Sequence, residues 1–531
     1  MMKTTLLATM MVMTLLSLTA SGAEKVIKRS EYHDRLHGFW LGACIANWTG
    51  LPTENRRTQA PFFTDMDWGK ATKYVLNQNP WGADDDTDIE YIYQHAMESY
   101  SPRLTGEQIS KEWQDHVHLP KLWVSNLAAL GQMQNGAVPP TTSLPENNPM
   151  WDMIDAQLTT EIFGALAPSR PDVALELAHL PIRTTAYMHS EWASEYYVIM
   201  HALVPVVDPD LSLKEQTQWL ASQARKRIPD WSYIADMHDF VKSEYEKNPD
   251  KENWEATRDL VYQRYQKKAA AGYRYTYPWD SGINFAASMV SLFYGEGDYK
   301  KTIRIGSLCG WDSDNPTSTW GGLLGLMYGR AGLEDHFDKT DFSSGYRIER
   351  TRSNMPIPVD TFEDMATRAL GVIDRIVIEE MGGAIKEDSW VIPDPGAEIK
   401  KVPMKQSTVQ WTIIEDKDSR WAYQGFETKD DQWNASGATL TTGQSDCQAQ
   451  ITFTGTAVQY YAYRDATGGE VTVYLDSIKQ GAFSLSNPIS QHYIKIFEVS
   501  GLKNEEHVLE IKGDDSNTMK SIDMLQIRGG D

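Results

Sequence analysis

The sequence is short of cysteine, of positive charge and of long apolar runs, and each shortage excludes a class of protein. Three cysteines in 531 residues are too few for a disulfide scaffold. An odd set, Cys44, Cys309 and Cys447, leaves at least one thiol unpaired. The apolar, glycine-flanked surroundings of Cys44 and Cys309 predict buried rather than catalytic thiols at these two positions. Acidic residues outnumber lysine and arginine by 73 to 50, so we expect no nucleic-acid partner. Beyond the N-terminus, no run approaches the ~20 apolar residues of a membrane span.

The N-terminal residues have the pattern of a secretory signal peptide over 1–23. Lys3 precedes an apolar run over 6–18, and the small residues 21–23 suit a signal peptidase. We therefore expect the mature chain to begin at Glu24 and to be periplasmic or secreted.

The rest of the chain divides into a helical part and a strand part. Over 24–390, apolar residues recur three and four positions apart, which predicts an all-α domain. Residues 391–408 contain three prolines and no sustained period, which is typical of a linker. Over 409–531, apolar and polar residues alternate between turn residues, which predicts an antiparallel β-sandwich of the jelly-roll type.

The strand part carries the segments FTGTAVQYYAY, GGEVTVYLDSI and VSGLKNEEHVLEIKG. In this order they resemble the galactose-binding-like modules that are appended to secreted glycosidases. The resemblance implies either carbohydrate binding or a purely structural role, and both stay open. Trp421, Tyr423 and Trp433 are candidates for stacking on a sugar, although core packing is the more frequent fate of such aromatic residues.

Three acidic clusters stand beside glycine or tryptophan in the helical part. They are Glu54 at the end of HGFWLGACIANWTGLPTE, Asp84, Asp85 and Asp86 in GADDDTD, and Asp312 and Asp314 with Asn315 in CGWDSDNP. Capping a helix start uses one such side chain, and adjacent carboxylates repel each other unless they are screened. Oxygen ligands without a Cys or His cluster favour a hard divalent ion, Mg²⁺, Mn²⁺ or Ca²⁺, over Zn²⁺.

The clusters match, in order, the motifs of a known family. LGACIANWTGLPTE resembles the GxxxGDAxGxxxE helix of the ADP-ribosylglycohydrolase family, DDDT its Ser/Thr-Asp-Asp-Thr motif, and CGWDSDNPTSTWGGLLGLMYG its GGDTDT helix. A further helix that begins at His189 also resembles the family, so that the match spans 33–330. The resemblance implies an all-α fold, two divalent ions, most simply Mg²⁺, and hydrolysis at an anomeric carbon. The implied metal ligands are Glu54, Asp84, Asp85, Asp86, Asp312, Asp314 and Asn315, with Glu54, Asp85 and Asp314 in catalysis.

Three positions depart from the family pattern. Asp84 replaces Ser or Thr, Asn315 replaces Thr, and Asn47 replaces Asp. An asparagine oxygen can still bind a hard cation, but the six carboxylates of the motifs exceed the four charges of two divalent ions. Either one carboxyl turns away or one keeps its proton, because like charges raise a pKa.

The expected substrate is a carbohydrate, most simply a furanoside or related sugar of a glycan. Residues 135–164, where the family binds diphosphate, contain no Lys or Arg and few glycines. Trp81, Trp279 and Trp311 are candidates for stacking on the sugar, although core packing is the commoner fate of each. Asp280, Asn284 and His189 are candidate polar contacts, with a capped helix start as the alternative for the first two.

Three functions are therefore compatible with the sequence. The first is an exported metal-dependent glycosidase. The second is an ADP-ribosyl-acceptor hydrolase with unusual phosphate recognition. The third is a non-catalytic carbohydrate-binding relative.

Overall fold

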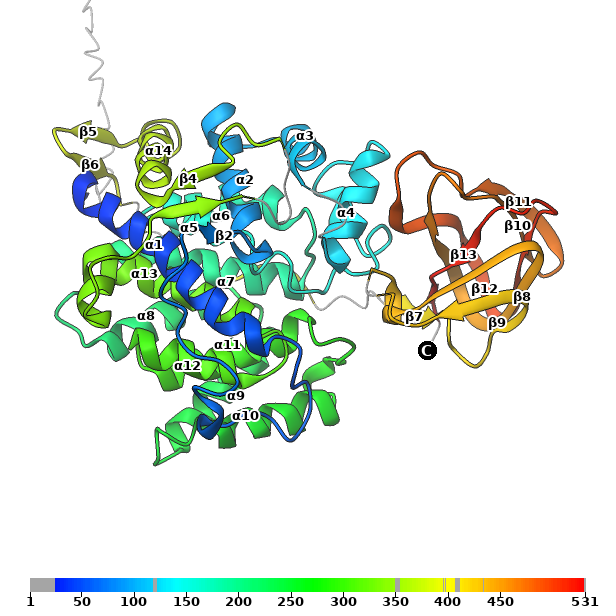
Figure 1. The fold of residues 1–531 in the computed structure, drawn as a ribbon, viewed down its shortest axis with the longest axis horizontal. Coiled ribbons are helices and arrows are strands. Elements are labelled where there is room, and N and C mark those ends of the chain that lie inside the picture. The colour runs from blue at the N-terminus through cyan, green and yellow to red at the C-terminus, as the bar shows by residue number, and fades with distance from the viewer. Residues whose placement is uncertain are drawn as a thin grey trace, which may run out of the picture.

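The computed structural model describes residues 24–117, 122–348, 354–394, 396, 398–405, 411–432 and 434–529. The expected signal peptide, 1–23, lies outside the described residues. Figure 1 shows a large helical part with a smaller strand module beside it. Among the described helices, none has the length and apolar character that crossing a membrane requires.

The helical part confirms the predicted fold class. Its helices are α1 (Arg29–Gly50), α2 (Asp85–Ser99), α3 (Gly106–His116), α4 (Val124–Gln134), α5 (Ile162–Leu166), α6 (Pro171–Ile182), α7 (His189–Leu203), α8 (Leu213–Arg225), α9 (Tyr233–Lys247), α10 (Trp254–Val261), α11 (Ser281–Gly295), α12 (Tyr299–Cys309), α13 (Asp314–Phe337) and α14 (Phe362–Arg375). Two three-stranded sheets, which the sequence did not predict, flank them. Their strands run in the orders β1 (Lys25–Lys28), β6 (Ser389–Ile392), β5 (Ala384–Lys386) and β2 (Trp81–Gly82), β3 (Gly345–Arg347), β4 (Val359–Thr361).

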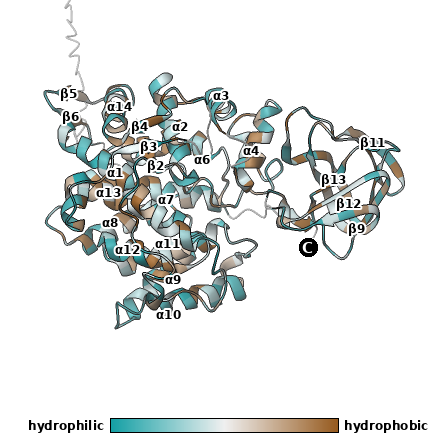
Figure 2. Cartoon of the chain, in the orientation of Figure 1, coloured by the Kyte–Doolittle hydropathy of each residue, from teal (hydrophilic) through white to brown (hydrophobic). Residues whose placement is uncertain are grey.

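Helices α1 and α13 form the centre of this part and almost touch. A Cβ atom on Gly42 would lie 2.3 Å from the Gly321 carbonyl oxygen, and one on Gly38 would lie 2.3 Å from that of Gly325. Only glycine permits such a close approach of two backbones. The small residues of the first and third motifs therefore bring the end of α1 beside the start of α13. Figure 2 shows hydrophobic residues along these inner helices.

The strand module is an antiparallel sheet wrapped around its own core, as predicted. Its strands are β7 (Trp411–Glu415), β8 (Ala422–Lys429), β9 (Leu440–Arg464), β10 (Glu470–Leu475), β11 (Ile478–Ser484), β12 (Gln491–Gly513), β13 (Lys520–Ile522) and β14 (Met524–Arg528). They pair in the order β11-β10-β12-β9-β14-β7, with β8 and β13 also paired to β9. Strand β6 ends at Ile392, so the first two residues of the expected linker belong to a sheet.

The module packs firmly against the helical part, beside α4 (Figure 1). Ile494 of β12 packs against Gly131 of α4. A Cβ atom added to Gly131 would lie 2.8 Å from Ile494 Cδ1. The Arg464 guanidinium donates to Asn135 Oδ1 at 2.6 Å. Tyr461 and Tyr493 belong to the same buried apolar cluster as the helical core. The strand module therefore shares a packed interface with the helical part.

Candidate metal centre and pocket

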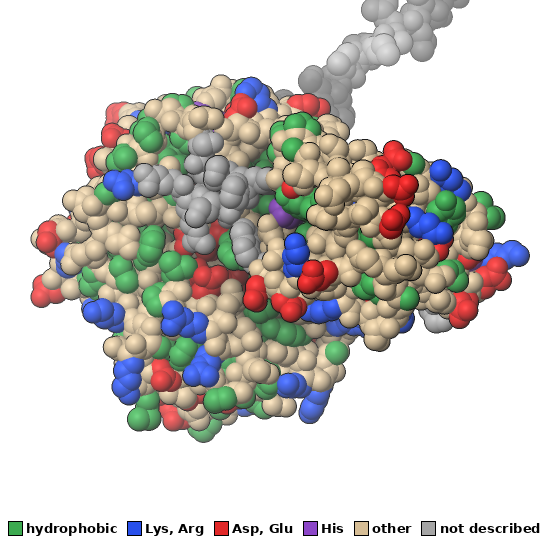
Figure 3. Space-filling view, turned by 45° about the vertical axis from the view of Figure 1, so that its right-hand side comes forward, with side chains coloured by type: hydrophobic (Ala, Val, Ile, Leu, Met, Phe, Trp, Pro, Cys, Tyr) green, Lys and Arg blue, Asp and Glu red, His purple; other side chains and the backbone are tan. Residues whose placement is uncertain are grey.

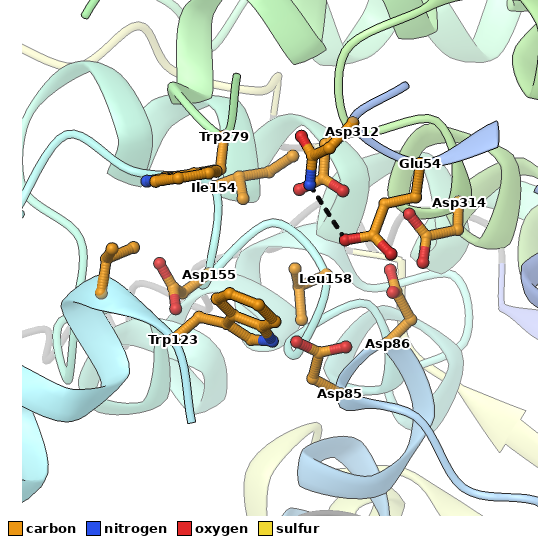
Figure 4. Close-up of a pocket in the computed structure, with 12 residues that line it drawn as sticks. Glu54, Asp85, Asp86, Trp123, Ile154, Asp155, Leu158, Trp279, Asp312 and Asp314 are labelled. Carbon is orange, nitrogen blue, oxygen red and sulfur yellow. Dashed lines mark hydrogen bonds between the residues drawn. The ribbon is translucent and has the colours of Figure 1, made fainter. Parts of the chain in front are cut away.

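Five carboxylates from the three motifs converge on one pocket (Figure 4). They are Glu54, Asp85, Asp86, Asp312 and Asp314. Glu54 follows the short turn at the end of α1, the aspartate pair opens α2, and the last two lie at the start of α13. One oxygen each of Glu54, Asp312 and Asp314 lie within 4.8 Å of one another. In Figure 3, acidic side chains gather near the middle of the face shown.

Tight backbone contacts hold the first and third motifs together. A Cβ atom on Gly50 would lie 2.6 Å from Asp314 Cα, so glycine alone fits at the end of α1. The Thr53 hydroxyl donates to the Gly50 carbonyl oxygen at 2.7 Å and lies 3.0 Å from Ser313 Oγ. Asn284 Oδ1 accepts the backbone N–H of Asp312 at 3.1 Å. Asn284 was a predicted substrate contact, but here its side chain positions a pocket carboxylate.

Asp84 does not line the pocket, but one of its oxygens lies within 4.8 Å of an oxygen of Asp85 and of Asp86, close enough to hold an ion with them. Its Oδ1 accepts the backbone N–H of Asp85 at 2.9 Å, and its Oδ2 accepts the side-chain amide of Asn47 at 2.8 Å. It thus caps α2 and ties that helix to α1. Asn315, another predicted ligand, donates its amide to Asp86 Oδ1 at 3.1 Å and also stays behind the lining.

The pocket is strongly negative and therefore suits cations. No Lys or Arg stands among the described residues that line it. Burial, followed by repulsion from Glu54, raises the pKa values of Asp312 and Asp314 well above their usual range. Burial and then the charge of Asp85 do the same for the pKa of Asp86, and burial raises the pKa of Asp85 to about 6. Such shifts mean that these groups need either protons or positive partners.

One buried carboxylate oxygen marks a position where a cation could bind. Asp314 Oδ1 is buried and accepts no hydrogen bond from the described residues. Burying a charged oxygen without a partner is costly, and carboxylate oxygens are the ligands that Mg²⁺ and similar hard ions prefer. The five carboxylates of the pocket therefore fit divalent cations.

Two tryptophans form the opposite wall of the pocket, Trp279 and Trp123 (Figure 4). Their ring centres are 6.5 Å apart, with an angle of 40° between the planes. Trp279 also stacks on Tyr277 at 5.5 Å, and the Tyr277 hydroxyl donates to Glu415 of the strand module at 2.5 Å. The cavity itself is about 30 Å³, and the empty space between its side chains, with the open mouth included, is about 420 Å³. Trp279 was predicted, and Trp123 was not.

Asp155 is a further pocket carboxyl that sequence reasoning missed. Figure 4 shows it between the two tryptophans. The Ser125 hydroxyl donates to it, and the backbone N–H of Asn126 lies 3.4 Å from its Oδ1. Burial raises the pKa of Asp155 to about 7, so it is partly protonated at neutral pH. The only signal in the sequence was a pair of aspartates, Asp152 and Asp155, within the otherwise mostly apolar run MWDMIDAQL.

Besides Asn284, four more predicted substrate contacts lie outside the pocket lining. Trp81 and Trp311 are fully buried, and their indole N–H groups donate to the Ser343 carbonyl oxygen and to Gln266. His189 stacks on Tyr233 with ring centres 3.9 Å apart. Asp280 is turned inward by the backbone N–H groups of Thr276 and Tyr277, at 2.5 and 3.0 Å. Core packing and, for Asp280, hydrogen bonds to the preceding turn therefore account for these residues; the Asp280 side chain does not cap α11, which was the expected alternative.

In the strand module, Trp421 and Tyr423 stack on each other at 5.5 Å and pack on the module's core. Their polar atoms bind the carbonyl oxygens of Glu415 and Asp416. This is the core packing considered above. Trp433 lies outside the described residues. All three cysteines are buried and unpaired, as expected for Cys44 and Cys309.

Comparisons with known proteins show what the chain is similar to. Two curated proteins of Flavonifractor plautii share short stretches with the chain. An "A type blood alpha-D-galactosamine galactosaminidase" is 31% identical over 104 residues, 19% of this chain and 9% of that protein. An "A type blood N-acetyl-alpha-D-galactosamine deacetylase" is 25% identical over 99 residues, 18% of this chain and 13% of that protein. The matches thus span about a tenth of those relatives.

A solved structure, an "ADP-ribosylglycohydrolase-related protein complex", aligns with a TM-score of 0.40 and 14% identity over 65% of this chain and 98% of its own. The model of one family, ADP-ribosylglycohydrolase, matches residues 28–366. That match covers more than half of the sequence and contains all three acidic motifs, and the chain therefore belongs to the ADP-ribosylglycohydrolase family.

Proposed function

We propose that the protein is an exported glycoside hydrolase that cleaves a glycosidic bond of a carbohydrate with the help of two divalent cations, most simply Mg²⁺. The observation that carries the proposal is the combination of five carboxylates and two tryptophans in one pocket. Export rests on the N-terminal pattern of the sequence alone.

The lining favours a sugar over a nucleotide diphosphate. Diphosphate groups are normally bound by basic side chains or by a glycine-rich cradle of N–H groups. The described lining offers neither Lys nor Arg, and its two aromatic rings suit the apolar face of a sugar. The two curated relatives are named for enzymes that act on amino sugars, which supports the same substrate class.

The chain's own residues have distinct tasks in this reaction. Glycoside cleavage requires a proton for the leaving oxygen, a base for the attacking water, and stabilisation of positive charge at the anomeric carbon. Asp155, whose pKa is raised to about 7 by burial, is suited to hold that proton. Glu54 is half-buried at the rim, where Asn55 donates to its Oε1 at 3.1 Å, and it serves as the base. The carboxylates of Asp85 and Asp314 stabilise the positive charge that develops at the anomeric carbon.

The carboxylates of Glu54, Asp85, Asp86, Asp312 and Asp314 would hold the ions. When bound, divalent cations bind sugar hydroxyls and make water more acidic.

The test is a screen of aryl glycosides, with aryl furanosides included, before and after treatment with EDTA. We expect hydrolysis of at least one glycoside, its loss on chelation, and its recovery with Mg²⁺. Asp314→Asn should lower kcat by about 10²-fold or more, because it removes a charge at the reacting centre. The matched control is Asp335→Asn, at the exposed far end of the same helix, which should leave turnover unchanged. Turnover that survives both chelation and Asp314→Asn contradicts the proposal.

Family membership also favours a second candidate, hydrolysis of an ADP-ribosylated acceptor. An ADP-ribosylated peptide in the same screen separates the two. Release of ADP-ribose, with every glycoside intact, would establish the second function. Metal binding and thermal stabilisation by Mg²⁺ without any turnover would instead identify a binding protein.

A further inference from the structure

A second group of potential metal ligands lies away from the pocket, between α2 and α3, which lie next to each other in Figure 1. His95 comes from α2, and Glu112 and His116 come from one face of α3, four residues apart. Glu112 Oε2 lies 3.4 Å from His116 Nε2 and 3.9 Å from His95 Nε2. All three atoms are within 4.8 Å of one another.

The carboxylate at the centre of this group is held in place but not satisfied. The Glu112 side chain is only 6% exposed. Its Oε1 accepts the Tyr100 hydroxyl at 2.8 Å, whereas its Oε2 has no hydrogen-bond partner among the described residues and points at the two imidazoles. The His95 and His116 side chains are 22% and 11% exposed, so an ion can reach the group from solvent.

We propose that His95, Glu112 and His116 bind a transition-metal ion, best matched by Zn²⁺, at a site separate from the hard-ion pocket. Two imidazoles and one carboxylate are preferred ligands of Zn²⁺, while the all-carboxylate pocket suits Mg²⁺. A tetrahedral zinc ion with bonds of about 2.0–2.1 Å places its ligand atoms about 3.3 Å apart. The Glu112–His116 separation is already close to this value, and the Glu112–His95 separation needs to close by about 0.6 Å.

The position of the site suggests its role. Helix α2 carries Asp85 and Asp86 at its N-terminal end, and His95 lies ten residues after Asp85 on the same helix, about 15 Å along its axis. The ion would join the far end of α2 to α3 and so steady the helix that presents two pocket carboxylates. Such an ion would have a structural role, because it links two helices.

The experiment is calorimetric titration of tag-free full-length protein with ZnCl₂ in saturating Mg²⁺, which occupies the carboxylate pocket. We expect one Zn²⁺ per chain. His95→Ala and Glu112→Gln should each weaken the Kd by about tenfold or more, because each removes a direct ligand. The matched control is His179→Ala, a more exposed helical histidine whose Nδ1 lies 4.0 Å from Glu191 Oε1 and which belongs to no group of three potential ligands among the described residues. Its Kd should equal that of the wild type.

A second readout keeps the test independent of folding defects. Circular dichroism and the Tm without zinc show whether each variant folds. Zinc should raise the Tm of the wild type and of Asp314→Asn, but not that of folded His95→Ala, which removes the most exposed ligand. Zinc affinity that is equal in the wild type and in His95→Ala overturns the proposal. So does zinc binding that disappears in Asp314→Asn, because the ion would then occupy the carboxylate pocket.

Discussion

Gly50 offers a sharp test of how the first and third motifs are brought together. Its φ of −77° and ψ of −37° are open to any residue, so replacement by alanine causes no backbone strain. The added Cβ would nevertheless lie 2.6 Å from Asp314 Cα and 2.9 Å from the Ser313 carbonyl oxygen. Carbon atoms in contact prefer about 3.5–4.0 Å, so the end of α1 and the start of α13 must separate by about 1 Å.

Two effects on stability oppose each other in Gly50→Ala. Alanine is favoured over glycine within a helix by up to about 1 kcal/mol. Overpacking of a tight contact costs about 1–3 kcal/mol, so we expect a net loss of up to about 2 kcal/mol. The effect on the pocket is larger, because a displacement of about 1 Å between reacting groups can lower the rate about 10²-fold. We therefore expect a 10²-fold lower kcat/KM and weaker stabilisation by Mg²⁺.

The matched control is Gly371→Ala in α14, where an added Cβ meets no atom within 4 Å. That variant should gain up to about 1 kcal/mol and keep wild-type activity. Urea unfolding measures stability, and Mg²⁺-dependent thermal shifts measure the ion site without any substrate. Wild-type Mg²⁺ response and turnover in Gly50→Ala would refute the argument that this glycine sets the spacing of the carboxylates.

Three further predictions follow from buried contacts. Tyr277→Phe removes the hydrogen bond to the strand module and loosens the neighbouring pocket wall, so steady-state kinetics should show a KM raised several-fold with kcat little changed. Burial raises the pKa of Asp152 to about 7, above its unfolded value near 4, so the folded protein holds this proton more tightly than the unfolded chain. The free energy of unfolding of the wild type should therefore fall as pH rises from 4 to 7, by up to roughly 4 kcal/mol. Urea unfolding of Asp152→Asn should lack this part of the fall. Asn47→Asp should destabilise the fold by about 3 kcal/mol at pH 7, because it buries a second charge against Asp84, and adding Asp84→Thr should restore most of that loss in the same assay.

The sequence predicted the two-part architecture and the convergence of the acidic motifs. Helical and strand periods differ clearly on either side of residue 400, and the three acidic motifs follow one another in the order that a single family shows. Motif order therefore located Glu54, Asp312 and Asp314 correctly in one pocket.

The direction of individual side chains could not be predicted in the same way. In a run of three aspartates, only the backbone at the helix start determines that Asp84 turns back as the cap while Asp85 and Asp86 face the pocket. Trp123 and Asp155 reach the same pocket from a segment without a metal motif, through tertiary packing alone. The contact between Tyr277 and Glu415 joins residues from two parts of the chain that sequence reasoning treated separately.

The contact between Asn47 and Asp84 accounts for two departures from the family pattern at once. The pattern has an acid at the first position and Ser or Thr at the second, whereas here the buried Asn47 amide donates to the buried Asp84 carboxylate at 2.8 Å. Two carboxylates in this contact would repel each other strongly, whereas the Asn47 amide donates a hydrogen bond to the Asp84 carboxylate, although Asn47 Oδ1 finds no hydrogen-bond partner among the described residues. The pair thus keeps one negative charge and moves it from α1 to the cap of α2. Because the charge is moved and not lost, these substitutions leave the five pocket carboxylates in place and do not favour a non-catalytic protein.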